Sequence, residues 1–130
     1  MNVFAYGTLQ IPEVMQAVTG ALFSSQPAWL EGYARYRLSG FSYPGLRAEA
    51  GSMTDGVVYR GVGREALAKL DAFEDIFYRR VSLRVTCASG DWMPAEVYVI
   101  PPEHGGLIDF RPWSFEEFRR DALAAFLKRL

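Results

Sequence analysis

The sequence predicts an α+β domain. Most of the expected strands follow one another through short turns, and helices are inserted between only some of them. This order favours α+β architecture over a doubly wound parallel sheet. The length of 130 residues predicts a single domain spanning 1–130, and a chain of this size buries roughly two thirds of its unfolded surface. Half of the residues are hydrophobic and 15% are aromatic, which indicates a folded core.

Charge and cysteine content narrow the class of protein. The net charge of −1 argues against a nucleic-acid partner, or an anionic membrane, bound through bulk electrostatics. The single cysteine, Cys87, excludes an internal disulfide and fits a reducing compartment. Neither a signal peptide nor a bilayer-spanning apolar stretch is evident. We therefore expect a cytoplasmic protein.

The first expected elements are a strand and a helix joined by a glycine turn. Apolar and aromatic residues in Val3–Tyr6 predict the strand, and Gly7 allows unusual backbone angles and a close approach by another molecule. Pro12 is favoured in the first turn of a helix. Apolar residues then recur at the spacing of one helix face, and we expect this helix to end near Ser24. They are Val14, Ala17, Val18, Ala21 and Leu22.

The next stretch predicts strands and turns. The aromatic-rich segment Trp29–Leu38 indicates a strand, and Gly40–Gly45 has strong turn signals. Leu46–Met53 fits more than one structure. Asp55-Gly56 is typical of a hairpin turn that leads into a strand at Val57–Tyr59.

A second helix over Arg64–Glu74 places a carboxylate on its buried side. Leu67 and Leu70 mark that side, and Glu74 follows them at helical spacing, with Asp71 at the edge of the same face. A lone carboxylate in such a position is costly unless it is paired or used. Glu74 is therefore a functional carboxylate, a residue turned to solvent at a frayed helix end, or the partner of a nearby arginine.

The second half of the chain predicts two strands and a last helix. Tyr78–Cys87 alternates apolar and polar residues, as a half-buried strand does. A capping box formed by Ser114 and Glu117 opens the last helix. Between these we expect a turn at Gly90-Asp91, a strand over Ala95–Ile100 and an irregular loop up to Pro112; the apolar stripe of the helix is Phe115, Phe118, Ala122, Ala125 and Phe126.

The segment Tyr6-Gly7-Thr8-Leu9 is a candidate binding loop. A connection from strand through glycine turn to helix leaves backbone N–H groups without partners, and such a nest suits an anionic or carbonyl oxygen. A tight turn without a ligand explains the same pattern. The loop lacks the glycines and the lysine of the phosphate-binding fingerprints.

Other residue types that often carry chemistry have structural explanations here. His104 lies in a Pro/Gly loop without a second ligand nearby, so we expect no metal site. Cys87 lies on the apolar face of its strand and is expected to be a buried core residue. Arg79, Arg80 and Arg84 are expected on a solvated or salt-bridged face.

Five segments carry a resemblance to a known family. In order they are Phe4–Leu9, Pro12–Met15, Tyr43–Gly45, Leu70–Glu74 and Tyr78–Arg80. Together they resemble the γ-glutamylcyclotransferase-like family, in particular its short plant and bacterial branch and the γ-glutamylamine cyclotransferases. The resemblance implies a small mixed, largely antiparallel β-barrel flanked by helices.

The resemblance also implies an activity and a set of site residues. Family members release 5-oxoproline from a small γ-glutamyl substrate, without a metal or another cofactor. The catalytic general acid and base would be Glu74, and the substrate-binding residues would be Tyr6, Gly7, Thr8, Leu9 and Tyr78. Asp75, which stands where many members have glycine, is a departure that bears on pocket shape and substrate.

An alternative interpretation is that the protein binds a ligand in the same pocket but does not catalyse a reaction. In that alternative the chain is a small-ligand binding or regulatory module without turnover. In either case the expected partner is a small γ-glutamyl compound rather than nucleic acid or a membrane, and the protein is expected to be a monomer or a homodimer.

Overall fold

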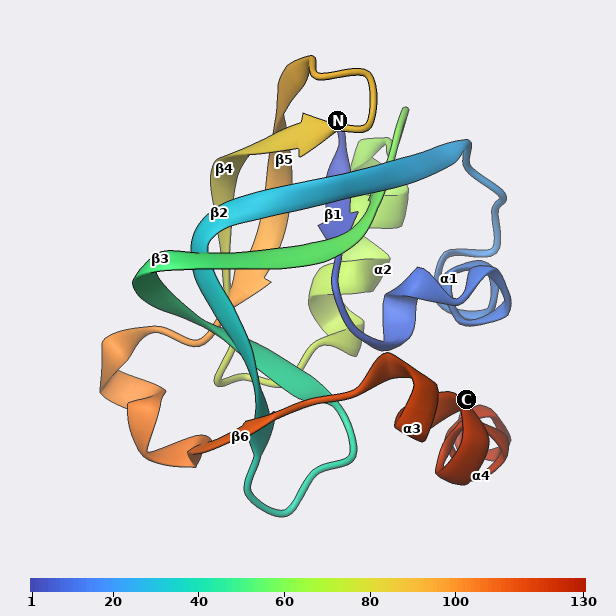
Figure 1. The fold of residues 1–130 in the computed structure, drawn as a ribbon. Coiled ribbons are helices and arrows are strands. Elements are labelled where there is room, and N and C mark those ends of the chain that lie inside the picture. Colours follow the sequence, from blue (N-terminus) through green and yellow to red (C-terminus); the bar gives the residue numbers. More distant parts are fainter.

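Five strands close into a mixed β-barrel, and a sixth strand extends it (Figure 1). The computed structural model describes residues 1–130. The strands are β1 (Val3–Ala5), β2 (Ser25–Leu38), β3 (Pro44–Tyr59), β4 (Arg79–Cys87), β5 (Trp92–Val99) and β6 (Ile108–Pro112). The order β3, β1, β5, β4, β2 is closed by pairing of β2 with β3, and β6 adds to β2. Only the β1–β5 pair is parallel, which confirms the predicted α+β barrel.

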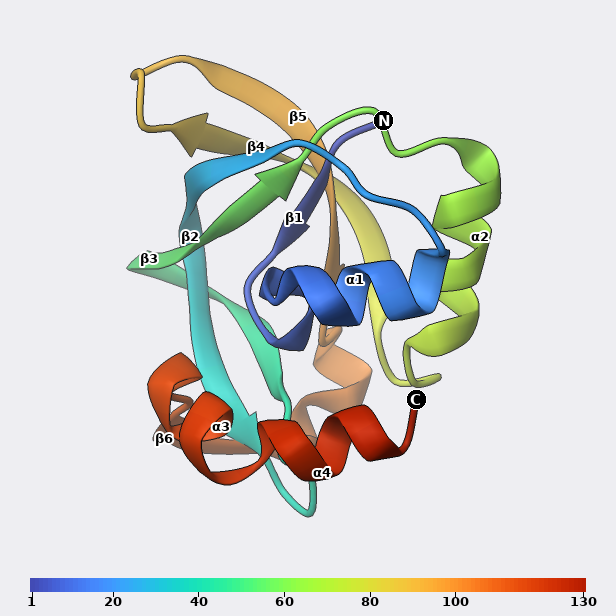
Figure 2. The same cartoon turned by 90° about the vertical axis from the view of Figure 1, so that its right-hand side faces the viewer.

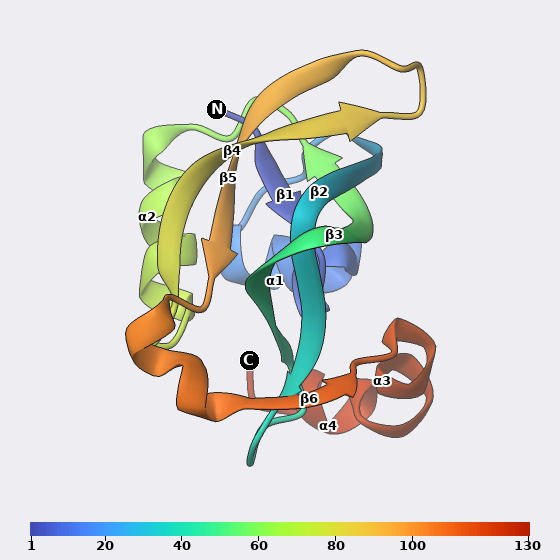
Figure 3. The ribbon, with the colours of Figure 1, turned by 60° about the vertical axis from the view of Figure 1, so that its left-hand side comes forward.

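The helices cover one side and one end of the barrel. They are the α-helices α1 (Pro12–Thr19), α2 (Arg64–Phe73), α3 (Phe115–Asp121) and α4 (Leu123–Lys128), and the 3-10 helices η1 (Thr8–Gln10) and η2 (Pro102–Leu107). Figure 2 shows α1 and α4 in front of the barrel, with α2 beside α1. Figure 3 shows the opposite side, where strands β2, β4 and β5 face the viewer. None of the helices has the length and hydropathy that a bilayer crossing requires.

The short strand β1 separates two apolar cores. Side chains alternate across a strand, so Phe4 points into the barrel while Val3 and Ala5 point toward the helices. The barrel core also takes Val85 and Cys87 from β4, which confirms the alternation predicted for that strand and the buried position of its cysteine. The helices therefore pack on the outer face of β1.

The hairpin turn predicted at Asp55-Gly56 is not present, because these residues belong to strand β3. Asp55 and Gly56 lie inside β3 and pair with Trp29 and Ala28 of β2, so the predicted turn is wrong. The true β2–β3 turn lies within residues 39–43. Gly56 serves close packing instead, because a Cβ atom there would lie 2.3 Å from the carbonyl oxygen of Ala5.

Three element boundaries also differ from those predicted. The helix α1 ends at Thr19 rather than near Ser24, because Gly20 adopts φ +76° and stops it. The segment expected to be an irregular loop before Pro112 contains η2 and β6, which pairs with β2. The last helix is divided into α3 and α4 at Ala122.

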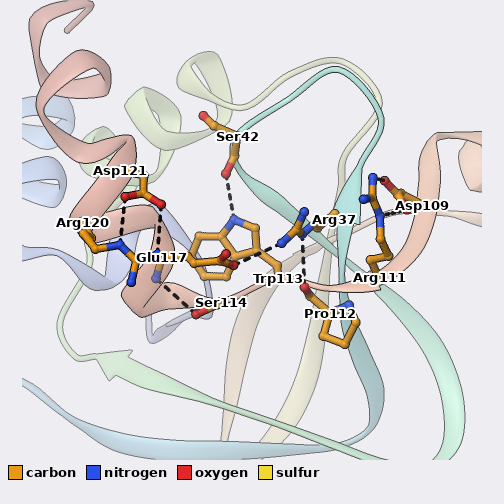
Figure 4. A network of polar contacts seen from close by, with 10 residues as sticks. All are labelled: Arg37, Ser42, Asp109, Arg111, Pro112, Trp113, Ser114, Glu117, Arg120 and Asp121. Carbon is orange, nitrogen blue, oxygen red and sulfur yellow. Dashed lines mark hydrogen bonds and ion pairs between the residues drawn. The ribbon is translucent and has the colours of Figure 1, made fainter.

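The C-terminal helices are attached through a polar network around Trp113 (Figure 4). The indole Nε1 of Trp113 donates to the carbonyl oxygen of Ser42 at 2.7 Å. Arg37 pairs with Glu117 at 3.1 Å. The Ser114 hydroxyl accepts from the backbone N–H of Glu117 at 3.2 Å, which confirms the Ser114 half of the predicted capping box. The Glu117 side chain does not form the other half, because it pairs with Arg37 instead. This network fixes the start of α3 and so directs α4 back toward the barrel.

We predict that Gly56→Ala destabilises the barrel by about 2 kcal/mol or more, because the added methyl group must displace the backbone of β1. Urea unfolding of the wild type and the variant measures the difference. Gly105→Ala is the matched control, since a Cβ atom at Gly105 meets nothing within 4 Å. Equal stability of the two variants would contradict the close approach of β3 to β1.

Candidate functional site

A cavity of about 290 Å³ opens between η1, the end of α2 and α4. A volume of this order suits a small molecule. All six residues predicted for the site line it: Tyr6, Gly7, Thr8, Leu9, Glu74 and Tyr78. Other lining residues that the sequence did not single out as site residues include Tyr43, Asp75, Tyr98, Phe126 and Arg129. The fold therefore brings together segments that are distant in the sequence.

The candidate binding loop Tyr6–Leu9 presents backbone N–H groups that have no acceptor in the helix that follows it. The two turns of η1 use the N–H groups of Gln10 and Ile11, which donate to the carbonyl oxygens of Gly7 and Thr8 at 3.1 Å. The preceding N–H groups have no acceptor within this short helix. Gly7 adopts φ −126°, so it does not use the left-handed region. It is required for close approach, since a Cβ atom there would lie 2.9 Å from the ring of Pro44.

Long-range hydrogen bonds hold both ends of the loop. At its start, the guanidinium of Arg35 donates to the carbonyl oxygen of Tyr6 at 2.9 Å, and also binds Asp55. At its end, the hydroxyl of Tyr59 donates to the carbonyl oxygen of Leu9 at 2.6 Å. These bonds come from strands β2 and β3, so the barrel wall sets the orientation of the loop N–H groups.

Two tyrosine hydroxyls act as buried donors around the cavity. The Tyr6 hydroxyl donates to the carbonyl oxygen of Tyr98 at 2.5 Å, and the Tyr78 hydroxyl donates to the carbonyl oxygen of Pro44 at 2.5 Å. Burial raises the pKa of both phenols well above 10. Both stay protonated, and Tyr78 holds Pro44 in place against the glycine of the loop.

Glu74 lies at the C-terminal end of α2 and lines the cavity. Its backbone N–H donates to the carbonyl oxygen of Leu70 at 3.0 Å, and its backbone is extended, so the helix ends one residue earlier. The side chain is half-buried and forms no ion pair. Pairing with a nearby arginine, one of the alternatives left by the sequence, is wrong because Arg80 pairs with Asp71 and Glu96 instead.

The surroundings of Glu74 favour its protonated form. Burial, followed by the charges of Asp75 and Asp71, raises the pKa of Glu74 from 4.5 to about 8. No hydrogen-bond donor or cation counteracts these effects. A carboxyl group with a pKa near neutrality can both accept and donate a proton at physiological pH.

The neighbouring carboxylate Asp71, unlike Glu74, is bound by polar side chains. Arg80 binds it through two nitrogens at 2.9 and 3.2 Å, and the Tyr98 hydroxyl donates to it at 2.6 Å. This pairing confirms a salt-bridged face for Arg80. Arg79 likewise pairs with Glu103, and Arg84 stacks on a tryptophan ring. Asp71, which lies within α2, is therefore held by Arg80 and Tyr98, while Glu74 has no ion-pair partner.

The structure brings no three histidine, cysteine, aspartate or glutamate side chains into a cluster that could hold a metal ion. His104 lies in η2, away from the cavity-lining residues. Cys87 lies in the barrel core. The absence of a cofactor stays a prediction.

The cavity thus combines backbone N–H groups of the loop with an ionisable carboxyl group, and its size suits a small molecule. The chain belongs to the γ-glutamyl cyclotransferase, AIG2-like family, whose model matches residues 3–115. Its relatives include AIG2-like protein C of Arabidopsis thaliana, 31% identical over 120 residues that cover 92% of this chain and 69% of that protein.

Solved structures share the fold. A solution structure of an Arabidopsis thaliana protein has a TM-score of 0.77 and 29% identity, and covers 98% of this chain and 78% of that one. A structure described as a gamma-glutamyl cyclotransferase has a TM-score of 0.68 at 15% identity, covering 98% of this chain and 83% of that chain. At that identity the second likeness shows the barrel architecture alone.

We predict that the charge of Glu74 destabilises the folded protein at alkaline pH. The folded pKa of about 8 lies above the ordinary value of 4.5, so the folded state binds the proton more tightly and stability falls as pH rises between these values. Glu74→Gln removes this effect and should stabilise the protein by about 1–3 kcal/mol near pH 9, and by much less near pH 5.

Chemical unfolding at the two pH values measures this difference. Glu65→Gln is the matched control, because Glu65 is exposed at the start of the same helix. A stability difference for Glu74→Gln that does not change with pH would show that Glu74 titrates normally.

Proposed function

We propose that this protein is a γ-glutamylcyclotransferase that releases 5-oxoproline from a γ-glutamyl amine, amino acid or peptide. The observation that carries the proposal is the unpaired carboxyl group of Glu74, with its pKa near 8, in the same cavity as the loop N–H groups. Family membership supports the same reaction class.

The reaction is intramolecular. The α-amine of the substrate attacks its own γ-carbonyl carbon, a C–N bond closes the five-membered lactam, and the original amide C–N bond breaks. Glu74 takes the proton that the attacking amine loses and delivers it to the departing amine. Because the nucleophile belongs to the substrate, the proposed reaction requires no covalent enzyme intermediate.

The pKa of Glu74 suits this proton transfer. A free α-amine has a pKa of about 8, close to the pKa of about 8 for the carboxyl group. A proton therefore moves between the two groups at little energetic cost. Acid and base assistance of this kind accelerates a reaction by roughly 10²–10⁴-fold.

The loop and its supporting residues would bind the substrate. The N–H groups of Gly7, Thr8 and Leu9 suit the substrate carboxylate or the oxyanion that develops on the γ-carbonyl. A donor aimed at an oxyanion contributes on the order of 10²–10³-fold. Tyr6 and Tyr78 would complete the binding surface and hold the loop in position. The cytoplasmic location and the monomeric or homodimeric state stay predictions.

We predict that the wild type releases 5-oxoproline from at least one member of a panel of γ-glutamyl amides, and that Glu74→Gln lowers the rate by about 10² or more. The substitution keeps the size of the side chain but removes the base. Chromatographic detection of 5-oxoproline measures the rate, with Glu65→Gln as the control expected to retain activity.

Equal rates in the wild type and Glu74→Gln would remove Glu74 as the base. A γ-glutamyl compound that raises the melting temperature but stays intact would instead support the binding module.

We also predict that Asp75→Asn shifts the ascending limb of the kcat/KM profile to lower pH. The charge of Asp75 contributes to the raised pKa of Glu74, so removing that charge lets Glu74 ionise more readily. The asparagine keeps an oxygen that can accept from the Tyr43 hydroxyl, which now donates to Asp75. Asp91→Asn, in the distant β4–β5 turn, should leave the profile unchanged. An unshifted limb in Asp75→Asn would mean that another group controls the rate.

A further inference from the structure

The cavity contains one cationic side chain, and its function is not assigned by the proposed proton transfer. Of the 16 lining residues, Arg129 alone is basic, whereas Glu74 and Asp75 are acidic. Arg129 follows α4 and lies beyond residues 3–115, the segment that the family model matches.

Arg129 is an exposed residue that lines the cavity and forms no ion pair. The side chain of Phe126 anchors α4, with ring centroids 6.3 Å from Phe73 and 5.6 Å from Phe118. Residues three apart share a helix face, so Arg129 follows Phe126 toward the cavity. It forms none of the ion pairs of the chain, although Asp75 lines the same cavity and accepts instead from the Tyr43 hydroxyl.

The charges of the cavity decide what this arginine can bind. A γ-glutamyl group brings an α-carboxylate, for which the loop N–H groups are suitable donors. A second carboxylate on the substrate would be repelled by Asp75 and by ionised Glu74 unless a cation received it. The guanidinium of Arg129 is free to do so, and its planar fork matches carboxylate geometry.

We propose that Arg129 determines specificity by binding a carboxylate on the leaving amine, so that the preferred substrates are γ-glutamyl amino acids rather than uncharged γ-glutamyl amines. This inference rests on the proposed function of the same cavity. It names the substrate class that the sequence motifs leave open.

Two compounds that differ only in this carboxylate test the proposal. The leaving group of γ-glutamylalanine is alanine, and that of γ-glutamylethylamide is the same group without its carboxylate. We expect kcat/KM of the wild type to be higher for γ-glutamylalanine by about tenfold or more, and Arg129→Gln to abolish most of that preference. Arg129→Lys should keep part of it, because the charge remains.

Lys128→Gln is the matched control. It removes one positive charge from the same end of α4, but Lys128 does not line the cavity. The preference should persist in this variant. A preference that disappears equally in Lys128→Gln would mean that overall charge, rather than contact with Arg129, governs the choice, and would overturn the proposal.

A binding measurement separates this proposal from the proposed reaction. Calorimetric titration of both compounds into Glu74→Gln, and into the same protein with Arg129→Gln added, measures the preference without turnover. Tighter binding of γ-glutamylalanine that depends on Arg129 would support the proposal even if the wild type released no 5-oxoproline. An equal loss of affinity for both compounds would show that Arg129 binds the α-carboxylate that they share, and would overturn the proposal. The absence of any preference, or of any binding, would also overturn the proposal.

Discussion

The rest of the structure depends on the burial of β1 in the barrel wall. Its three residues pair with β3, Val3 also pairs with Glu96 of β5, and each of the three is at most 3% exposed. The strand has no room to shift, because Gly56 of β3 lies directly against it. The loop that leaves β1 is therefore fixed at its origin, and Arg35 and Tyr59 fix its carbonyl groups from the neighbouring strands. Rigid backbone donors of this kind bind without first being ordered.

The same strand explains why Glu74 has an unusual environment. The helix α2 packs on the outer face of β1 and ends at Phe73, so Glu74 follows it and lines the same cavity as the loop. Of the two carboxylates on this part of α2, Asp71 is paired with Arg80 and with the Tyr98 hydroxyl. Asp71 therefore places a negative charge close to Glu74, while Arg80 is paired with Asp71 and does not pair with Glu74. The raised pKa of Glu74 is thus a consequence of how the surrounding polar groups are partnered as well as of burial.

Patterns that depend on near neighbours in the sequence were predictable. The alternation in β4, the cap at Ser114 and the inward side of α2 each follow from spacing within a single element. The predicted turn at Asp55-Gly56 failed because a glycine chosen for close packing against a distant strand looks the same as one chosen for a turn. The positions of Arg35 and Arg129 could not be predicted from nearby residues. Arg35 contacts the loop from the distant strand β2, and Arg129 reaches the cavity from the end of α4. The candidate site was therefore predictable where it coincides with motifs, and not where it is assembled by long-range contacts.

Two separate parts of the chain form the walls of the cavity, and under the proposed mechanism each wall would bind a different part of the substrate. The loop and Glu74 lie within the segment that the family model matches, whereas Phe126 and Arg129 come after it. The network around Trp113 attaches the start of α3 to the barrel, and the packing of Phe126 on Phe73 brings α4 to the cavity. Lactam closure needs the first wall alone, since the attacking amine and the γ-carbonyl belong to the same glutamyl group in every substrate. The leaving amine is the part that varies, and it is the part that a separately attached C-terminal helix can select without disturbing the proton transfer.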